Sequence, residues 1–91
     1  MAPKTRLLKS SQGMTRDELA DFLEGIAGRI RGGEVALTAG ADSTTLQIPE
    51  QVTVDVEAVT QDKARGTKTE LEIEIEWYPD GVAAASGIEL G

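Results

Sequence analysis

Apolar residues between positions 16 and 31 recur every three or four residues, which is the repeat of an amphipathic helix. The apolar side chains that share one side are Leu19, Phe22, Leu23, Ile26, Ala27 and Ile30. Before this segment, Thr15 can cap the first amides while Glu18, three residues on, reaches back as in a capping box. After it, Gly32 and Gly33 allow the positive φ that ends many helices. The pattern predicts a helix over residues 16–31 with one side buried.

From residue 34 onward the apolar period changes from 3.6 to 2, the period of a β-strand with one buried face. The inward positions are Val35, Leu37, Leu46, Ile48, Val52, Val54, Val56, Leu71, Ile73, Ile75 and Trp77. Turn-forming residues at 39–43, 49–51 and 62–66 divide this stretch into four strands. Because antiparallel neighbours need only short turns, we predict an antiparallel meander over residues 34–77.

The four strands have a register in which no strand turns its apolar side chains to the other face. In that register the facing pairs are Val35 with Ile48, Leu37 with Leu46, and Val54 with Ile73. We expect Trp77, the last inward residue, to close the core, because a large aromatic side chain supplies much of the buried area in a small domain.

The segments on either side of this pattern complete the predicted fold. Residues 5–10 can form a short additional strand with Leu7 and Leu8 as its apolar anchors, and the Ala-, Gly- and Ser-rich residues 80–91 are expected to form a flexible tail. The prediction is a single α+β domain over residues 1–79, with the element order β-α-β-β-β-β. One amphipathic helix packs on one face of a mostly antiparallel sheet of four or five strands.

The predicted helix is too narrow to cover the whole predicted sheet. A helix is about 10 Å across, whereas five strands span about 19–24 Å. Apolar sheet surface would therefore remain for a second copy of the chain, and a homodimer follows as a hypothesis.

The composition excludes most familiar catalytic sites. The 91 residues include no cysteine and no histidine, so the chain has no thiolate nucleophile, disulfide, zinc–sulfur site or imidazole base. The sequence also contains no serine-elbow, P-loop or dinucleotide-binding glycine motif. We therefore expect no enzyme, and the sequence indicates no catalytic, cofactor-binding or metal-binding residue.

The charge of the chain restricts the partners that it attracts. Sixteen acidic and nine basic residues give a net charge of −7, which disfavours binding to nucleic acid or to an anionic membrane and favours cationic partners. The sequence has no apolar run near the ~18–20 residues that cross a bilayer, and it opens with no secretory signal pattern. The expected location is the cytoplasm.

Acidic residues are concentrated on the outward face of the last two predicted strands. They are Asp55, Glu57, Glu70, Glu72, Glu74 and Glu76. Any register that keeps the valines buried sets these carboxylates opposite or diagonal to one another, where like charges repel. The acidic face is either a solvated surface or a docking face for a basic protein partner. We expect no metal site, because Ca²⁺ and Mg²⁺ need oxygen ligands that converge from loops.

Four segments together resemble a known family. They run from Met14 to Leu19, from Gly32 to Val35, from Ile48 to Glu50 and from Leu71 to Trp77. With this pattern the chain, from about Leu7 to Trp77, is similar to the Amphi-Trp domain, a small prokaryotic family named for an alternating amphipathic stretch that ends in tryptophan. The Ala/Gly-rich tail departs from the family pattern. The resemblance implies the α+β fold and brings no established activity, cofactor or catalytic residue.

The sequence therefore favours a protein-interaction module that uses its acidic sheet face or a sheet edge. The partner would be a basic protein or a second copy of this chain. The alternative is a structural or accessory homo-oligomeric protein without a specific ligand, whose acidic face keeps it soluble. An enzyme ranks third, because it would need a pocket that this sequence gives no reason to expect.

Overall fold

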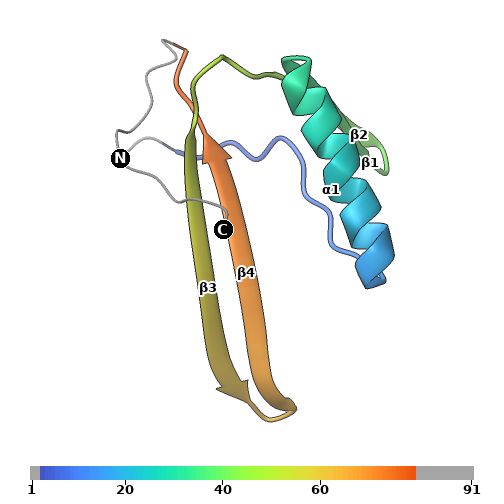
Figure 1. The fold of residues 1–91 in the computed structure, drawn as a ribbon, viewed down its shortest axis with the longest axis vertical. Helices are drawn as coiled ribbons and strands as arrows, with labels where there is room; N and C mark the ends of the chain where they lie inside the picture. Colours follow the sequence, from blue (N-terminus) through green and yellow to red (C-terminus); the bar gives the residue numbers. More distant parts are fainter. Residues whose placement is uncertain (1–2, 80–91) are drawn as a thin grey trace. The chain divides into compact units, whose positions relative to one another are not determined.

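The computed structural model describes residues 3–79, which form one helix and four strands (Figure 1). In chain order these are α1 (Arg16–Arg31), β1 (Glu34–Ala39), β2 (Asp42–Gln47), β3 (Thr53–Lys63) and β4 (Gly66–Glu76). The predicted α+β class is confirmed. The chain divides into two units, residues 1–48 and residues 49–91, and each is described by itself. The single domain over 1–79 stays a prediction, and the tail predicted over 80–91 lies outside the described residues.

Helix α1 begins and ends where the sequence predicts. The Glu18 amide donates to the Thr15 hydroxyl and the Thr15 amide donates to the Glu18 carboxylate, both at 3.1 Å, which completes the capping box. At the other end the Gly32 amide donates to the carbonyls of the last helical turn, and Gly33 has a φ of +85°. Within the described part of the chain, no helix is long and apolar enough to cross a membrane.

Strands β1 and β2 pair antiparallel through a tight turn at Gly40, whose φ is +61°. Val35 on β1 faces Leu46 on β2, so the predicted pairing of Val35 with Ile48 is wrong by two residues. The reason is that the turn is shorter than the predicted five-residue segment, while a shift of two residues keeps each side chain on its predicted face. Leu37 likewise faces Thr44 instead of Leu46.

Helix α1 packs against β1, and the first unit has a very small core. Val35, which is 4% exposed, is the one buried apolar side chain among residues 3–79. The prediction that one helix side is buried is wrong, because no residue of α1 is buried and Phe22 remains 47% exposed. A sheet of two strands about 5 Å apart is too narrow to cover the apolar side of a helix about 10 Å across.

The N-terminal segment has no regular structure. Residues 5–10 form no strand, so the predicted first strand is wrong. Leu7 is 58% exposed, and its neighbour Leu8 is half-buried. Two apolar anchors surrounded by charged and polar residues bury too little surface to hold a strand in place.

The second unit is a long antiparallel hairpin of β3 and β4. Within the described residues these strands pair with each other alone, so the four strands form two separate two-stranded sheets and not the predicted single sheet. The connection from β2 to β3 contains Pro49, which has no amide proton to donate to a continuing ladder. Residues 48–52 therefore separate the two hairpins.

The hairpin strands are longer than predicted. They continue to a two-residue turn, Ala64 and Arg65, that lies inside the predicted turn segment. Val54 faces Ile75, so the predicted pairing of Val54 with Ile73 is wrong by two residues, again with the faces preserved. Trp77 follows β4 and is half-buried.

One face of the hairpin is apolar and largely uncovered. Its side chains are Val54, Val56, Ala58, Leu71, Ile73 and Ile75. The exposed fraction of the large ones runs from 38% at Ile75 to 68% at Leu71. The opposite face of the hairpin carries the acidic side chains.

Candidate functional site

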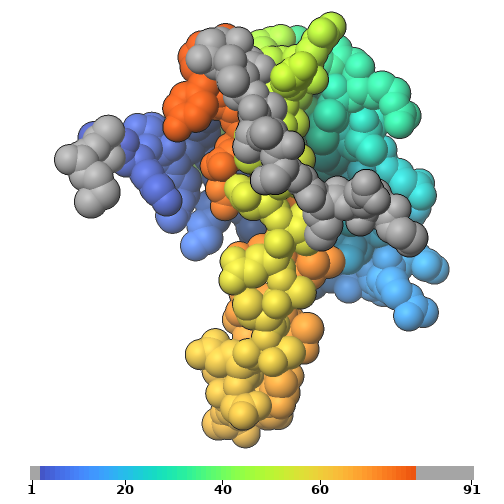
Figure 2. Space-filling model, turned by 60° about the vertical axis from the view of Figure 1, so that its left-hand side comes forward, coloured from blue at the N-terminus to red at the C-terminus, as the bar shows by residue number. Residues whose placement is uncertain are grey.

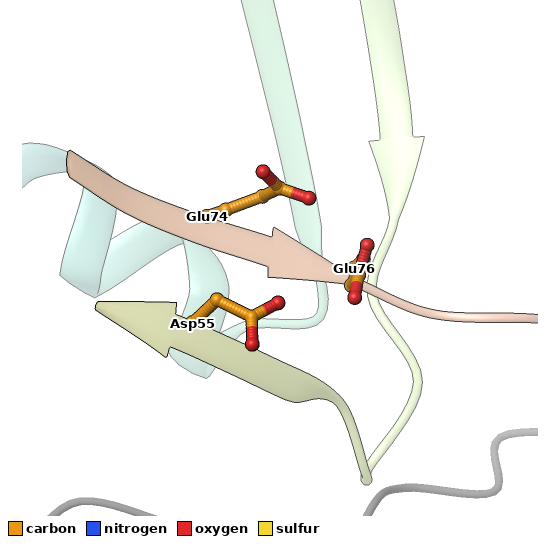
Figure 3. A group of neighbouring side chains, drawn as sticks. All are labelled: Asp55, Glu74 and Glu76. Atoms are coloured by element: carbon orange, nitrogen blue, oxygen red, sulfur yellow. The ribbon is translucent and has the colours of Figure 1, made fainter. Parts of the chain in front are cut away.

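The acidic side chains predicted from the sequence lie together on the polar face of the β3–β4 hairpin, which we call the acidic face. The ladder places Asp55 directly opposite Glu74 and Glu57 directly opposite Glu72. These residues share a face because every second side chain of a strand points the same way. Figure 3 shows Asp55 on β3 with Glu74 and Glu76 on β4. The structure thus brings all six candidate residues onto one surface, with two pairs of carboxylates facing each other.

Glu76 lies in a cluster of three carboxylates on this face. Carboxylate oxygens of Asp55, Glu74 and Glu76 lie within 4.8 Å of one another. Hydrogen bonding to Glu74, then to Asp55, raises the pKa of Glu76, and repulsion from both neighbouring carboxylates raises it further. The cluster therefore favours binding of a proton or of another cation.

The same three carboxylates are the residues that could hold a metal ion. Oxygen donors suit Ca²⁺ and Mg²⁺, and the hairpin brings three of them together across two strands, although a row along one strand does not converge. All three side chains are exposed. Ca²⁺ requires six to eight oxygen ligands, so three exposed carboxylates would leave most of its coordination shell to water.

Toward the turn, the polar face changes from acidic to neutral and basic. Val59 lies opposite Glu70, Gln61 opposite Lys68, and Lys63 opposite Gly66. Lys68 forms a salt bridge with Glu70 at 3.2 Å, the only salt bridge within residues 3–79. The other acidic residues of the face have no such cationic partner in the described part of the chain.

The prediction from the sequence did not include the part of the polar face that lies near the turn. Val59 and Lys63 follow Glu57 at spacings of two and six residues, so the period of the strand places them on the same face. Lys63 falls inside the predicted turn at 62–66, whereas Val59 lies before that turn, where the period of two already places it on the polar face.

The end of the hairpin is a small basic surface. An open hollow at the turn is lined by residues 63–68, among them Lys63, Arg65 and Lys68. The Thr67 hydroxyl donates to the Asp62 carboxylate at 3.0 Å and so ties the two strand ends together. This part of the molecule is the yellow-to-orange lower end of the space-filling view (Figure 2).

Comparison with known proteins finds one family. The model of the Amphi-Trp domain matches residues 1–90, which includes the tail that the sequence pattern had set apart from the family. Among curated proteins and solved structures, no match to this chain is found. The match covers the helix, both hairpins and the alternating strand that leads to Trp77. The chain therefore belongs to the Amphi-Trp domain family.

Proposed function

We propose that this domain is a protein-interaction module whose acidic face binds a basic partner. The observation that carries the proposal is the direct opposition of Asp55 to Glu74 and of Glu57 to Glu72. Like charges placed opposite each other across two strands destabilise a hairpin. A cationic partner would relieve that repulsion on binding, so the arrangement is costly in the free protein and favourable in a complex.

The spacing of the carboxylates indicates the form of the partner. Alternate residues of a strand are about 6.8 Å apart, so the glutamates of β4 form a row with that period. An extended segment with lysine or arginine at every second residue has the same period. We therefore propose a basic segment in extended conformation as the ligand. The proposal includes no catalytic role.

A binding experiment with defined peptides tests this function. The probe is a synthetic peptide that alternates lysine and threonine, compared with a peptide of equal composition whose lysines form one block. We expect the alternating peptide to bind more tightly in calorimetry, and its affinity to fall as salt is added. Equal affinity of the two peptides would contradict the proposed extended ligand.

Two variants with the same net charge distinguish binding by the acidic face from an effect of net charge alone. In the first, Glu70, Glu72, Glu74 and Glu76 are each changed to Gln. In the control, four exposed acidic residues elsewhere are neutralised: Asp21→Asn, Glu24→Gln, Glu34→Gln and Glu50→Gln. We expect the first variant to lose peptide affinity by about tenfold or more and the control to retain it. The same loss in both variants would show that only net charge matters and would overturn the proposal.

A structural, self-associating protein is the second candidate function. The observation that favours it is the exposed apolar face of the hairpin, where Leu71 is 68% exposed and Ile73 is 56% exposed. A two-stranded hairpin is at best marginally stable in water unless further strands or a helix cover it. Self-association would supply such cover and would leave the acidic face free.

A further inference from the structure

Between Val54 and Lys63, the outer edge of β3 is available for strand pairing. Within the described residues β3 pairs with β4 on one side, and no strand pairs with its other edge. The strand is 11 residues long and contains neither proline nor glycine. Natural proteins protect long edges with prolines, bulges or charged side chains, because unpaired amides and carbonyls recruit another strand. Between Glu57 and Asp62, the middle of β3 carries no proline, bulge or charged side chain.

Val59 interrupts the polar face at the middle of this edge. It shares that face with Glu57 and Gln61, lies opposite Glu70, and remains 38% exposed. An apolar side chain among charged ones on a solvated face does not stabilise the fold by burial. Val59 would bury apolar surface if a second apolar side chain were placed directly opposite it.

The charges on the two sides of Val59 are complementary to those of a second copy of β3 that runs antiparallel to the first. Along the polar face β3 presents Asp55, Glu57, Val59, Gln61 and Lys63 in this order. An antiparallel copy centred on Val59 sets Asp55 opposite Lys63 of the second copy, and Lys63 opposite Asp55 of the second copy. Glu57 then faces a glutamine, and Val59 faces its own symmetry mate. Opposite charges in facing positions stabilise a strand pair.

We propose that β3 pairs antiparallel with β3 of a second copy of this chain, with Val59 on the two-fold axis. The two hairpins then form one four-stranded sheet with β4 at each edge. Each contact except the one between the two Val59 side chains occurs twice, because the two-fold interface is isologous. The proposed interface shares Asp55 and Glu57 with the acidic face, whereas the glutamates of β4 lie away from the new strand pair.

On the apolar face, the same register sets polar side chains of one copy opposite apolar side chains of the other. Ala58 comes to lie opposite Thr60 of the second copy, and Val56 opposite Asp62 of the second copy. The Asp62 carboxylate already accepts a hydrogen bond from the Thr67 hydroxyl. The apolar faces of the two hairpins become continuous, because a pairing between residues of the same face leaves no strand reversed.

The edge of β4 does not offer an equivalent pairing. Its polar side chains after Lys68 are Glu70, Glu72, Glu74 and Glu76. Consider β4 paired antiparallel with β4 of a second copy, with the polar faces on the same side and most of the strand overlapping. Every such register places glutamate opposite glutamate. Such pairs are destabilising, so charge directs the second copy to β3.

Single-cysteine variants test the proposed register directly, because the chain has no cysteine of its own. In Val59→Cys the two thiols would lie opposite each other, within the Cα separation that a disulfide allows. The matched control is Glu70→Cys, at the position on β4 that faces Val59. In the proposed dimer the two control thiols would be about 14 Å apart, three strand spacings, which is too far for a disulfide.

We expect the Val59→Cys variant to form a covalent dimer under mild oxidation at least about tenfold faster than Glu70→Cys. Non-reducing electrophoresis gives the two rates. Equal rates, or a faster control, would overturn the proposal. This measurement stands even if the charge variants described next fail to fold.

Charge reversal tests the ion pairs of the interface. Asp55→Lys and Lys63→Asp each place like charges opposite each other twice, and we expect each to weaken dimerisation by about tenfold. The double variant restores the pairs in reversed order and should return to within about threefold of the original affinity. Sedimentation over a range of concentrations measures the dimer. A chain that stays monomeric at every concentration, or a double variant no better than the single ones, would overturn the proposal.

Discussion

Thr15 and Glu18 satisfy each other's backbone amides at the start of α1. The hydroxyl of Thr15 accepts from the Glu18 amide, and the carboxylate of Glu18 accepts from the Thr15 amide. These are two of the amides that have no partner inside the helix. Because no residue of α1 is fully buried, such local contacts carry an unusually large share of the stability of the helix.

Replacing the cap should therefore weaken the first unit measurably. We expect Thr15→Ala to lower the free energy of unfolding by about 1 kcal/mol, the usual cost of removing a threonine cap. Urea unfolding followed by the circular dichroism of the helix measures the change. Thr5→Ala, in the irregular segment before α1, is the control and should have no effect. A loss of the same size in the control would contradict the assigned role of the cap.

The capping box also predicts the sign of a pH effect. Hydrogen bonds from the Thr15 amide and then the Thr15 hydroxyl lower the pKa of Glu18 in the folded chain. A lowered pKa gives a stabilisation that is complete above the unfolded value of about 4.3 and is lost as the pH falls through the folded value. Glu18→Gln should remove this part of the acid sensitivity, measured as helix stability against pH. An unchanged pH profile in the variant would contradict the prediction.

Two glycines near the end of α1 should respond to alanine in opposite ways. A Cβ at Gly28 would have nothing within 4 Å among the described contacts, so Gly28→Ala should stabilise the helix by about 1 kcal/mol. Gly33 has a φ of +85°, so Gly33→Ala should cost about 1–2 kcal/mol. Urea unfolding measures both. If Gly28→Ala destabilised the protein, a neighbour must pack closely at that position.

The elements that the sequence predicts correctly are those fixed by local signals. The bounds of α1 follow from the cap at Thr15 and the glycines after Arg31, and both act within one helical turn. The faces of the strands follow from a period of two. Register was wrong by two residues in both hairpins, because this shift leaves every side chain on its face and only the exact turn residues distinguish the two registers.

Longer-range pairing was not predictable from these patterns. Alternation indicates that β2 and β3 each have an apolar face, but it does not indicate whether they are neighbours, and Pro49 lies between them. The acidic face was predicted because it needs only the period of the strand. The place of Lys63 on that face was missed because it depends on where the turn begins, whereas the place of Val59 needs only the period of the strand.

Because the first unit has a small core, we expect its stability to depend more on Val35 than on its other apolar residues. This side chain is 4% exposed and belongs to β1, the strand that α1 contacts. Val35→Ala removes two methyl groups at about 0.8 kcal/mol each and leaves a cavity, so we expect a loss of roughly 2 kcal/mol. Helix circular dichroism in urea measures it. Leu7→Ala, at a side chain that is 58% exposed, is the control and should change stability little. Equal losses would show that Val35 is not the centre of the core.

The repulsion around Glu76 predicts a pH effect of the opposite sign to that of Glu18. Hydrogen bonding to Glu74 and then to Asp55, followed by repulsion from both carboxylates, raises the pKa of Glu76 in the folded chain, so the folded state binds this proton more tightly than the unfolded state does. At neutral pH the ionised group destabilises the hairpin. As the pH falls through the raised folded value toward the unfolded value of about 4.3, protonation relieves the repulsion and stability rises.

Glu76→Gln should therefore stabilise the hairpin at neutral pH and remove the rise in stability on acidification. The fluorescence of Trp77, the only tryptophan, reports unfolding of the second unit because this residue directly follows β4. Glu50→Gln removes the same charge from the same unit outside the acidic face and should leave the rise in place. High salt should shrink the difference between Glu76→Gln and the original chain, since it screens exposed charges. If Glu76→Gln were less stable than the original chain at neutral pH, the carboxylate would be making a favourable contact, and repulsion would not be the dominant interaction on the acidic face.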